Sequence, residues 1–454
     1  MKSAIVLAAG KGTRMKSSLP KVMHPILSEP MIVHVVTHLE KIKVDHTVVV
    51  IGHGGDVVQN CLKESVSYAT QVEQLGTGHA VMQAMPVLAS DGDTILLYGD
   101  TPCIQSETMQ RLFDLNQAYD LTVLTAVFED AAQYGRIVRD TQGQIKSIVE
   151  YKDCTEDQRK IKEINTGIYC FKNKALHAYI KELTNDNAAH EYYITDLIEI
   201  FLKHNLRVQG VVIEDSDEVQ GVNDRLDLAK ASQWIQRKIN TEWMKKGVTF
   251  INPDLSFVSL NTTLGEDVTI YPNVYLEKKN SLGNNVTLLP NTFLVNATIG
   301  NNVKIDASRV TDSEVGNDVN IGPYAHLREH CVIADKNRIG NFVEMKKTIF
   351  GYDSRCAHLS YLGDSIVGAQ VNIGCGVVTV NYDGKNKHQT IIKDNAFIGS
   401  NANLIAPIVV GQHAVVAAGS TITKSVEDAD MAIARSHQVN KPGYGARYKE
   451  KAKK

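Results

Sequence analysis

The sequence of 454 residues lacks long apolar runs and a strong excess of either charge. None of its apolar stretches reaches the roughly 20 residues that a membrane-spanning helix requires. A strand-like run begins at residue 3, so we expect no signal peptide. The net charge is −3, and no basic field of the whole chain indicates nucleic acid as a partner. We therefore expect a cytoplasmic protein that engages neither a membrane nor a nucleic acid.

Cysteine is sparse and unpaired. The seven cysteines are odd in number, widely scattered, and never spaced as Cys-x-x-Cys. This pattern favours reduced thiols in the cytosol over a disulfide framework. It also argues against a structural zinc site, which requires clustered ligands.

Both of the common phosphate-loop patterns are absent from the glycine-rich stretch LAAGKGTRM, residues 7–15. The Walker A and dinucleotide patterns, started at Gly10, each require glycine where the chain has Met15. The residues of the loop are nevertheless small enough for a nucleotide to approach the backbone. Arg14 and Lys21 supply positive charge for a triphosphate. The sequence thus predicts a nucleotide loop of another class.

Two halves of the chain have different periods. Residues 1–222 alternate short β-like runs with helical patterns, which predicts βαβ units and a parallel sheet. Residues 135–150 break this rhythm and predict a hairpin with its turn near Gln142 and Gly143. Residues 223–247 have helical spacing throughout, and we interpret them as a connecting helix.

From about residue 250 the period becomes six. A hexapeptide period of aliphatic residues predicts a parallel β-helix, in which each aliphatic side chain points into a triangular prism. The segment 379–391 is too long and too polar for one hexad, so we expect a loop outside the prism. The aliphatic positions in register are Leu264, Ile270, Leu276, Leu282, Leu288 and Leu294; Val315, Ile321, Leu327, Ile333, Ile339 and Met345; and Ile392, Ile398, Leu404, Val410, Val416 and Ile422.

Several motifs resemble those of a known family. LAAGKGTRM followed by LPKVMHPI resembles the signature of sugar-1-phosphate nucleotidyltransferases, and GNFVEMKK, AHLSYLGD and NYDG follow within the hexapeptide region. Together they resemble the bifunctional bacterial N-acetylglucosamine-1-phosphate uridyltransferase / glucosamine-1-phosphate acetyltransferases over essentially the whole chain. The resemblance implies an α/β Rossmann-like nucleotidyltransferase domain (1–222), a linking helix (223–247) and a left-handed parallel β-helix acetyltransferase domain with a C-terminal tail (248–454).

The function that this resemblance implies has two steps. Acetyl-CoA acetylates glucosamine 1-phosphate, and UTP then transfers its uridylyl group to N-acetylglucosamine 1-phosphate with release of pyrophosphate. The product, UDP-N-acetylglucosamine, is a precursor of bacterial envelope polymers. The resemblance further implies small-molecule substrates, Mg²⁺ as cofactor, and a homotrimer with acetyltransferase sites between subunits. The flat faces of a β-helix prism independently favour sites between neighbouring prisms.

Nucleotidyl transfer depends on in-line positioning and charge neutralisation more than on a protein nucleophile. Arg14 and Lys21 are therefore our catalytic candidates in the first half. Asp100 ends the strand-like run LLYGDTP, where one carboxylate suits the sparse protein ligation of Mg²⁺. Asn223 alone would be only a helix cap, but the resemblance makes it a second metal ligand. The remaining UTP and UDP-N-acetylglucosamine positions that the resemblance implies are Leu7, Ala8, Gly10, Lys21, Gln71, Gly76, Thr77, Tyr98, Gly135, Glu150, Asn165 and Asn223.

Acetyl transfer to an amine requires a general base, and histidine is the natural one near neutral pH. Among 15 histidines, His358 is the one that matches the base of the family. The resemblance assigns Arg328 and Lys346 to the sugar phosphate, and Tyr361 and Asn372 to the sugar. The acetyl-CoA positions are Cys375, Asn381, Tyr382, Ser400, Ala418 and Arg435, of which Cys375 replaces the usual alanine.

Two other functions fit parts of the sequence. The chain could be a monofunctional sugar-1-phosphate nucleotidyltransferase with a structural or regulatory β-helix. It could also be a nucleotide-sensing scaffold with both sites inactive. A purely structural β-helix has no reason to keep the set around His358 and Arg328, and a sensor has none to keep Arg14, Lys21 and Asp100.

Overall fold

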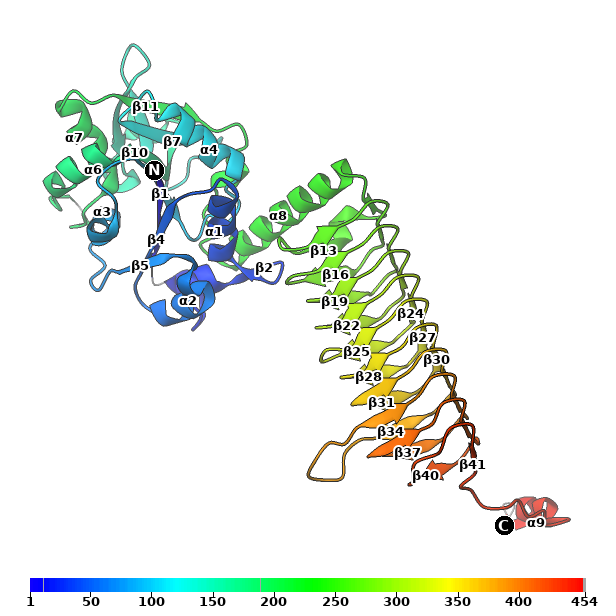
Figure 1. The fold of residues 1–454 in the computed structure, drawn as a ribbon. Coiled ribbons are helices and arrows are strands. Elements are labelled where there is room, and N and C mark those ends of the chain that lie inside the picture. The colour runs from blue at the N-terminus through cyan, green and yellow to red at the C-terminus, as the bar shows by residue number, and fades with distance from the viewer. Residues whose placement is uncertain (11, 188, 452–454) are drawn as a thin grey trace. The chain divides into compact units, whose positions relative to one another are not determined.

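The computed structural model describes residues 1–10, 12–187 and 189–451. The chain forms two compact units, Met1–Lys238 and Ile239–Lys454. The division falls inside helix α8 (Arg225–Lys245). Figure 1 labels the elements of each unit.

The first unit is built on one mixed sheet whose strand order is β11-β7-β10-β6-β1-β4-β5. Alternate residues of β1 belong to two different core clusters, so the sheet is buried on both faces by helices. The strands are β1 (Lys2–Ala8), β4 (His46–Ile51), β5 (Ser67–Thr70), β6 (Asp93–Tyr98), β7 (Leu121–Val127), β10 (Glu163–Lys172) and β11 (Val208–Val212). The helices are α1 (Met31–Lys41), α2 (Gly55–Leu62), α3 (Thr77–Ala84), α4 (Ser106–Leu115), α5 (Glu156–Arg159), α6 (Asn173–Tyr179) and α7 (Leu197–Lys203).

The predicted parallel sheet is confirmed with one exception. Strands β1, β4, β5 and β6 are parallel, as are β7 and β11, but β10 runs antiparallel to both of its neighbours. Between β7 and β10 the chain forms a hairpin and only the four-residue helix α5. Residues 128–162 are enough for a crossover, but they form this hairpin in place of the long helix of a βαβ unit, and β10 returns in the opposite direction.

The predicted hairpin is also confirmed, as β8 (Arg136–Arg139) and β9 (Ile145–Val149), which pair antiparallel. Asp140 Oδ1 accepts from the backbone N–H groups of Gln142 and Gln144, and Gly143 takes a φ of 80°. A second small hairpin pairs β2 (Pro25–Ile26) with β3 (Glu29–Pro30).

Helix α8 confirms the long helical pattern with slightly narrower bounds than 223–247. Asp224 caps its start, because Asp224 Oδ1 accepts from the N–H groups of Leu226 and Asp227. Gly247 follows its end with a φ of 92°, a conformation that glycine adopts without strain. Within the second unit, Asn240 of this helix donates to the carbonyls of Pro253 and Ser256, at 2.8 and 2.9 Å.

The second unit is the predicted β-helix, made of three parallel sheets that are named here by their first strands. Most strands are only two or three residues long, and many corners between them hold Asn or Asp with positive φ, which these residues tolerate. The β12 sheet contains β12 (Thr249–Phe250), β15 (Thr269–Ile270), β18 (Thr287–Leu288), β21 (Lys304–Ile305), β24 (Asn320–Ile321), β27 (Arg338–Asn341), β30 (Arg355–His358), β33 (Asn372–Ile373), β36 (Phe397–Ile398), β39 (Val415–Val416) and β41 (Met431–Ala432).

The other two sheets close the prism, and their inward aliphatic residues join one continuous core. The β13 sheet contains β13 (Ser256–Val258), β16 (Val274–Glu277), β19 (Phe293–Val295), β22 (Arg309–Thr311), β25 (His326–Arg328), β28 (Glu344–Lys346), β31 (Tyr361–Gly363), β34 (Val378–Val380), β37 (Asn403–Ile405) and β40 (Thr421–Ile422). The β14 sheet contains β14 (Thr263–Leu264), β17 (Ser281–Leu282), β20 (Thr298–Ile299), β23 (Glu314–Val315), β26 (Val332–Ile333), β29 (Ile349–Phe350), β32 (Ser365–Val367), β35 (Thr390–Ile392) and β38 (Ile408–Val410).

The loop outside the prism is present but shorter than the predicted 379–391. It runs between β34 and β35, at residues 381–389, because Thr379 and Thr390 are buried and belong to the strands. Helix α9 (Tyr444–Lys451) lies near the end of the chain. None of the described helices combines the length and apolar character that crossing a membrane would require.

Candidate active sites

A cavity of about 380 Å³ opens in the first unit where β1 and β6 end. Ligands of open α/β folds bind at this carboxyl edge. Gly12 lets the opening loop turn here, because its φ is 58° and a Cβ would lie 2.6 Å from Lys21 Cβ. The predicted residues on the walls of this first cavity are Leu7, Ala8, Gly10, Arg14, Lys21, Gln71, Gly76, Thr77, Tyr98, Asp100 and Asn223.

The charged groups of the first cavity converge on one another. Lys21 Nζ forms an ion pair with Asp100 Oδ2 and lies 3.4 Å from Asn223 Oδ1. Arg14 Nη2 donates to the same oxygen of Asn223, at 2.8 Å. The N–H of Val222 donates to the carbonyl oxygen of Asp100, which ties the Asn223 loop to the end of β6. Two cations and two oxygen ligands, predicted separately from the sequence, therefore form one cluster.

A second cavity, of about 370 Å³, adjoins the first. The two share five residues on their walls, among them Tyr98, Asp100 and Asn223. Gly135, Glu150 and Asn165, the predicted positions that the resemblance assigns to the N-acetylglucosamine part of the ligand, all line the second cavity.

Hydrogen bonds fix the positions of Asn165 and Gly135 on the wall of the second cavity. Asn165 Oδ1 accepts from the Tyr169 hydroxyl at 2.9 Å and from the N–H of Gly167 at 3.1 Å. The Asn165 N–H donates to the carbonyl of Gly135. The amide nitrogen of the Asn165 side chain thus remains as its donor group.

Two acidic groups have raised pKa values: Glu150 on the wall of the second cavity, and Asp196, which follows the wall residue Thr195 in sequence. Burial raises the pKa of Glu150, and the nearby charges of Asp196, Asp153 and Glu191 add to the shift. Burial, with the charges of Glu199 and Asp153, raises the pKa of Asp196 to about 6. Glu150 thus presents a carboxyl group to the second cavity, where it can form hydrogen bonds with sugar hydroxyls.

The structure adds wall residues that the sequence analysis missed. Glu191 lines both cavities, and Tyr193 and Thr195 line the second. They reach the site because the N–H of Gly78 donates to the carbonyl of Tyr192 at 2.7 Å, across more than 100 residues of sequence. No sequence pattern around residues 191–195 identifies these residues as part of a binding site. Gly12 and Thr13 also line the first cavity, and both belong to the loop LAAGKGTRM of the sequence analysis.

In the β-helix, the predicted base and three acetyl-CoA positions lie in one column. Asn341 pairs with His358 in the β12 sheet. The buried residues Cys356, Ile373, Ile398 and Val416 are paired in successive coils. Each of these buried residues is followed, two positions later, by an exposed residue on one corner of the prism. The exposed residues are His358, Cys375, Ser400 and Ala418.

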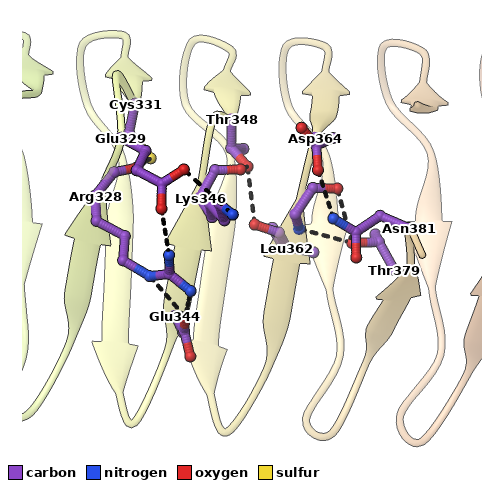
Figure 2. A network of polar contacts seen from close by, with 11 residues as sticks. Arg328, Glu329, Cys331, Glu344, Lys346, Thr348, Leu362, Asp364, Thr379 and Asn381 are labelled. Atoms are coloured by element: carbon purple, nitrogen blue, oxygen red, sulfur yellow. Dashed lines mark hydrogen bonds and ion pairs between the residues drawn. The ribbon is translucent and has the colours of Figure 1, made fainter. Parts of the chain in front are cut away.

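The two predicted phosphate ligands are neighbours in the β13 sheet, where Arg328 pairs with Lys346. Both contact Glu329, with Arg328 Nη1 at 2.7 Å and Lys346 Nζ at 3.2 Å, as Figure 2 shows. Arg328 also donates to Glu344 Oε1 from Nε, at 2.9 Å. The hydrogen bond to Glu344, with the negative charges of Glu344 and Glu329, raises the pKa of Arg328, so the guanidinium group stays positively charged.

Tyr361 and Asn381 approach each other over Gly363. A Cβ at Gly363 would lie 2.5 Å from the Tyr361 hydroxyl and 2.6 Å from Asn381 Nδ2. Asn381 Nδ2 donates to Asp364 Oδ2 at 2.5 Å, which is drawn in Figure 2. Only glycine at position 363 leaves room for this arrangement.

The other acetyl-transfer candidates are more dispersed. Arg435 Nη1 donates to the Ala418 carbonyl at 2.7 Å, which brings these two predicted positions together. Tyr382 is exposed, and its hydroxyl donates to the carbonyl of Gly384. Asn372 lies on β33, in register with Arg355 rather than with Tyr361.

Comparison with known proteins follows the same division of the chain. A nucleotidyl transferase family model matches residues 3–244, and a bacterial transferase hexapeptide model matches residues 312–347 and 389–424. The bifunctional protein GlmU of Geobacillus sp. (strain WCH70) is 49% identical over 97% of this chain and 97% of its own. The chain belongs to the GlmU family.

Further GlmU proteins show the same coverage. That of Shouchella clausii is 46% identical over 97% of this chain and 98% of its own length. That of Listeria monocytogenes serotype 4a is 47% identical over 97% of both chains. As a GlmU protein, the chain is a bifunctional uridyltransferase and acetyltransferase of UDP-N-acetylglucosamine synthesis, with UTP and acetyl-CoA as substrates.

Proposed function

We propose that the first unit carries uridylyl transfer, with the nucleotide in the first cavity and the sugar phosphate in the second. The observation that carries this proposal is the cluster of Arg14, Lys21, Asp100 and Asn223 where the two cavities meet. A phosphate oxygen of the sugar attacks the α-phosphorus there, and pyrophosphate leaves. Arg14 and Lys21 neutralise the charge that develops on the phosphates, and the cavity walls hold the two reactants in line.

Asp100 and Asn223 are the proposed Mg²⁺ ligands. Their oxygens both point at one positive centre, Lys21 Nζ, so they converge on a position suited to a cation. Two protein oxygens, completed by phosphate and water, match the sparse coordination that Mg²⁺ usually has. Among the residues described, no group of three or more His, Cys, Asp or Glu side chains forms a metal site by protein ligands alone. When bound, Mg²⁺ supplies charge neutralisation for the triphosphate.

The second unit is proposed to acetylate glucosamine 1-phosphate. His358 takes the proton from the sugar amine as it attacks the thioester of acetyl-CoA, and CoA leaves as the thiol. Arg328 and Lys346 hold the 1-phosphate, and Tyr361 and Asn372 hold the sugar. The corner column of Cys375, Ser400 and Ala418, with Asn381, Tyr382 and Arg435, holds acetyl-CoA.

The assembly is proposed to be a homotrimer. His358, Ser400, Ala418 and Arg435 are exposed on the outside of a prism, where one chain alone gives a ligand little enclosure. A neighbouring copy would close this site. We also propose a cytoplasmic location, which suits acetyl-CoA and the seven free cysteines.

A coupled assay tests the assignment. Full-length protein receives glucosamine 1-phosphate, acetyl-CoA, UTP and Mg²⁺, and CoA, pyrophosphate and UDP-N-acetylglucosamine are measured separately. Lys21→Ala should stop pyrophosphate release while CoA release continues. Lys16→Ala is the matched control, because Lys16 is an exposed lysine just beyond the opening loop. Equal pyrophosphate release by the two variants would overturn the proposed site.

The domain bounds are also a proposal, with a uridyltransferase domain at 1–222, a linking helix at 223–247 and the acetyltransferase domain at 248–454. A fragment ending at Gly247 should fold and retain uridylyl transfer, because the sheet and both cavities lie within the first unit. A soluble fragment without this activity would show that the second unit completes the first site.

A further inference from the structure

We propose that His79 is a positioning residue that fixes the Gln71 amide and so makes the nucleotide site favour uracil over cytosine. The inference rests on the proposed function of the first cavity as the nucleotide site. Gln71 follows β5, lines that cavity and is 4% exposed. His79 lies on α3 and is not part of the cavity wall.

The orientation of the Gln71 amide is set by Gly76. Gln71 Nε2 lies 3.0 Å from the Gly76 carbonyl oxygen. A carbonyl oxygen only accepts, so the NH₂ end of the amide must face it. The Gly76 backbone is itself held, since its φ is 109° and a Cβ there would lie 2.6 Å from the Tyr192 carbonyl oxygen.

The second hydrogen of the same NH₂ group points at His79, whose Nδ1 lies 3.2 Å from Gln71 Nε2. Nδ1 must therefore accept, and the ring proton of the neutral imidazole is on Nε2. Gln83 Nε2 lies 3.0 Å from His79 Nε2, one helical turn further along α3. The same Nε2 of Gln83 also donates to the His79 carbonyl oxygen at 3.4 Å. Because two donors cannot face each other at 3.0 Å, we assign the Gln83 amide the other way round, with Oε1 toward the His79 Nε2–H. In this orientation Gln83 accepts from the tautomer of His79 that Gln71 requires, and His79 fixes Gln71.

This chain of contacts leaves Gln71 Oε1 as the end of the amide that is available to a ligand. Among the described residues, none donates a hydrogen bond to Oε1. Uracil carries a donor at N3, which pairs with this acceptor, whereas cytosine has a lone pair at N3 and is repelled. Turning the amide to suit cytosine would break both of its contacts and set Oε1 against the Gly76 carbonyl. A site that holds a fixed polar group discriminates strongly against a ligand of the wrong polarity.

The test compares UTP with CTP in the full-length protein, with N-acetylglucosamine 1-phosphate as acceptor. His79→Leu removes the acceptor at Nδ1, and the ratio of kcat/KM for UTP to that for CTP should fall about five- to tenfold, the weight of one hydrogen bond. His79→Asn places an amide oxygen near the position of Nδ1 and should restore most of the ratio. Acetyl transfer by the same preparations reports whether each variant is folded and assembled.

An unchanged ratio in a folded His79→Leu variant would overturn the inference, as would a ratio in His79→Asn no better than in His79→Leu. If His79→Leu does not fold, Gln83→Leu replaces it, because it removes the acceptor for the His79 Nε2–H and should lower the ratio in the same direction. A ratio that stays at the wild-type value in Gln83→Leu would also contradict the inference.

Gln71→Ala separates this inference from the proposed function. If Gln71→Ala keeps the wild-type kcat/KM for UTP, the first cavity does not hold the base, and the proposed function fails with the inference. If Gln71→Ala loses UTP activity while His79→Leu keeps the wild-type ratio, only the role of His79 is wrong.

Discussion

The two units present their candidate sites in opposite ways. In the first, residues from β1, β6, the 71–77 segment and the loop before α8 enclose two adjoining cavities within one chain. In the second, the candidates follow successive coils along the outside of a prism, and His358 and Ser400 are exposed. A twisted α/β sheet gathers its loops at one edge and makes a pocket. A β-helix repeats the same corner coil after coil and makes a straight column.

The two activities should therefore have different requirements for assembly. The first unit contains every predicted wall residue of its site in one copy. The second unit presents an exposed column of candidate residues. The other side of its site must come from a neighbouring chain, which the proposed trimer supplies. A change in the site of one unit should therefore leave the activity of the other unit unaffected.

The largest effect should come from Asp100→Ala. Uridylyl transfer should fall to background, on the order of 10³-fold or more, because the variant loses both the proposed metal ligand and the ion-pair partner of Lys21. Acetyl transfer should stay near the wild-type rate. Pyrophosphate release and thiol release, measured on one preparation, check this. Normal formation of UDP-N-acetylglucosamine by the variant would refute the metal assignment.

His358→Ala should act on the other unit alone. Acetyl transfer should fall about 10²- to 10⁴-fold, the usual contribution of a general base. Uridylyl transfer from supplied N-acetylglucosamine 1-phosphate should not change. Acetyl-CoA binding, followed by calorimetry, should persist because His358 is assigned to proton transfer. Near-normal acetylation would leave the second activity without a base.

Arg328→Ala should change saturation more than rate. The KM for glucosamine 1-phosphate should rise about 10- to 100-fold, because one charged contact to the phosphate is lost. Arg309→Ala is the matched control, since Arg309 lies on the preceding coil of the same sheet, in register with His326. Initial rates over a range of sugar phosphate concentrations check this. A fall in kcat with unchanged KM would place Arg328 elsewhere in the reaction.

A smaller effect is expected for Asp196→Asn, and it is one of stability. Burial raises the pKa of Asp196 to about 6 in the folded protein, above its ordinary value of 3.8. The folded state then holds the proton more tightly, so this group costs stability as the pH rises from about 4 through 6. Asp196→Asn should raise the melting temperature of the first unit more at pH 7.5 than at pH 4.5. An equal change at both pH values would contradict the assigned shift.

Sequence periodicity predicted the fold well. The six-residue spacing of aliphatic residues such as Ile270, Leu276 and Leu288 produced the three sheets, because every inward position of a narrow prism must be apolar. The antiparallel β10 was not predicted, since its direction depends on the hairpin that replaces a crossover helix before it rather than on its own residues. The ends of the loop outside the prism were placed too wide because buried Thr379 and Thr390 look polar.

The candidate sites were predictable where a motif carries the chemistry. Arg14, Lys21 and Asp100 come from quoted motifs, and the structure brings them together. Glu191 was not found, nor were the contacts that link the predicted Gln71 to His79 and Gln83. Their positions depend on contacts between distant segments and on the direction of hydrogen bonds. A single sequence does not encode either as a local pattern.

The central claim is that one chain completes the first site, whereas the second requires a neighbouring copy. The most direct test follows both activities per chain along one dilution series, with light scattering to report the size of the assembly. We predict that acetyl transfer per chain falls in step with the loss of trimers, while uridylyl transfer per chain stays constant. Single chains that acetylate glucosamine 1-phosphate as fast as the assembled protein would contradict the account.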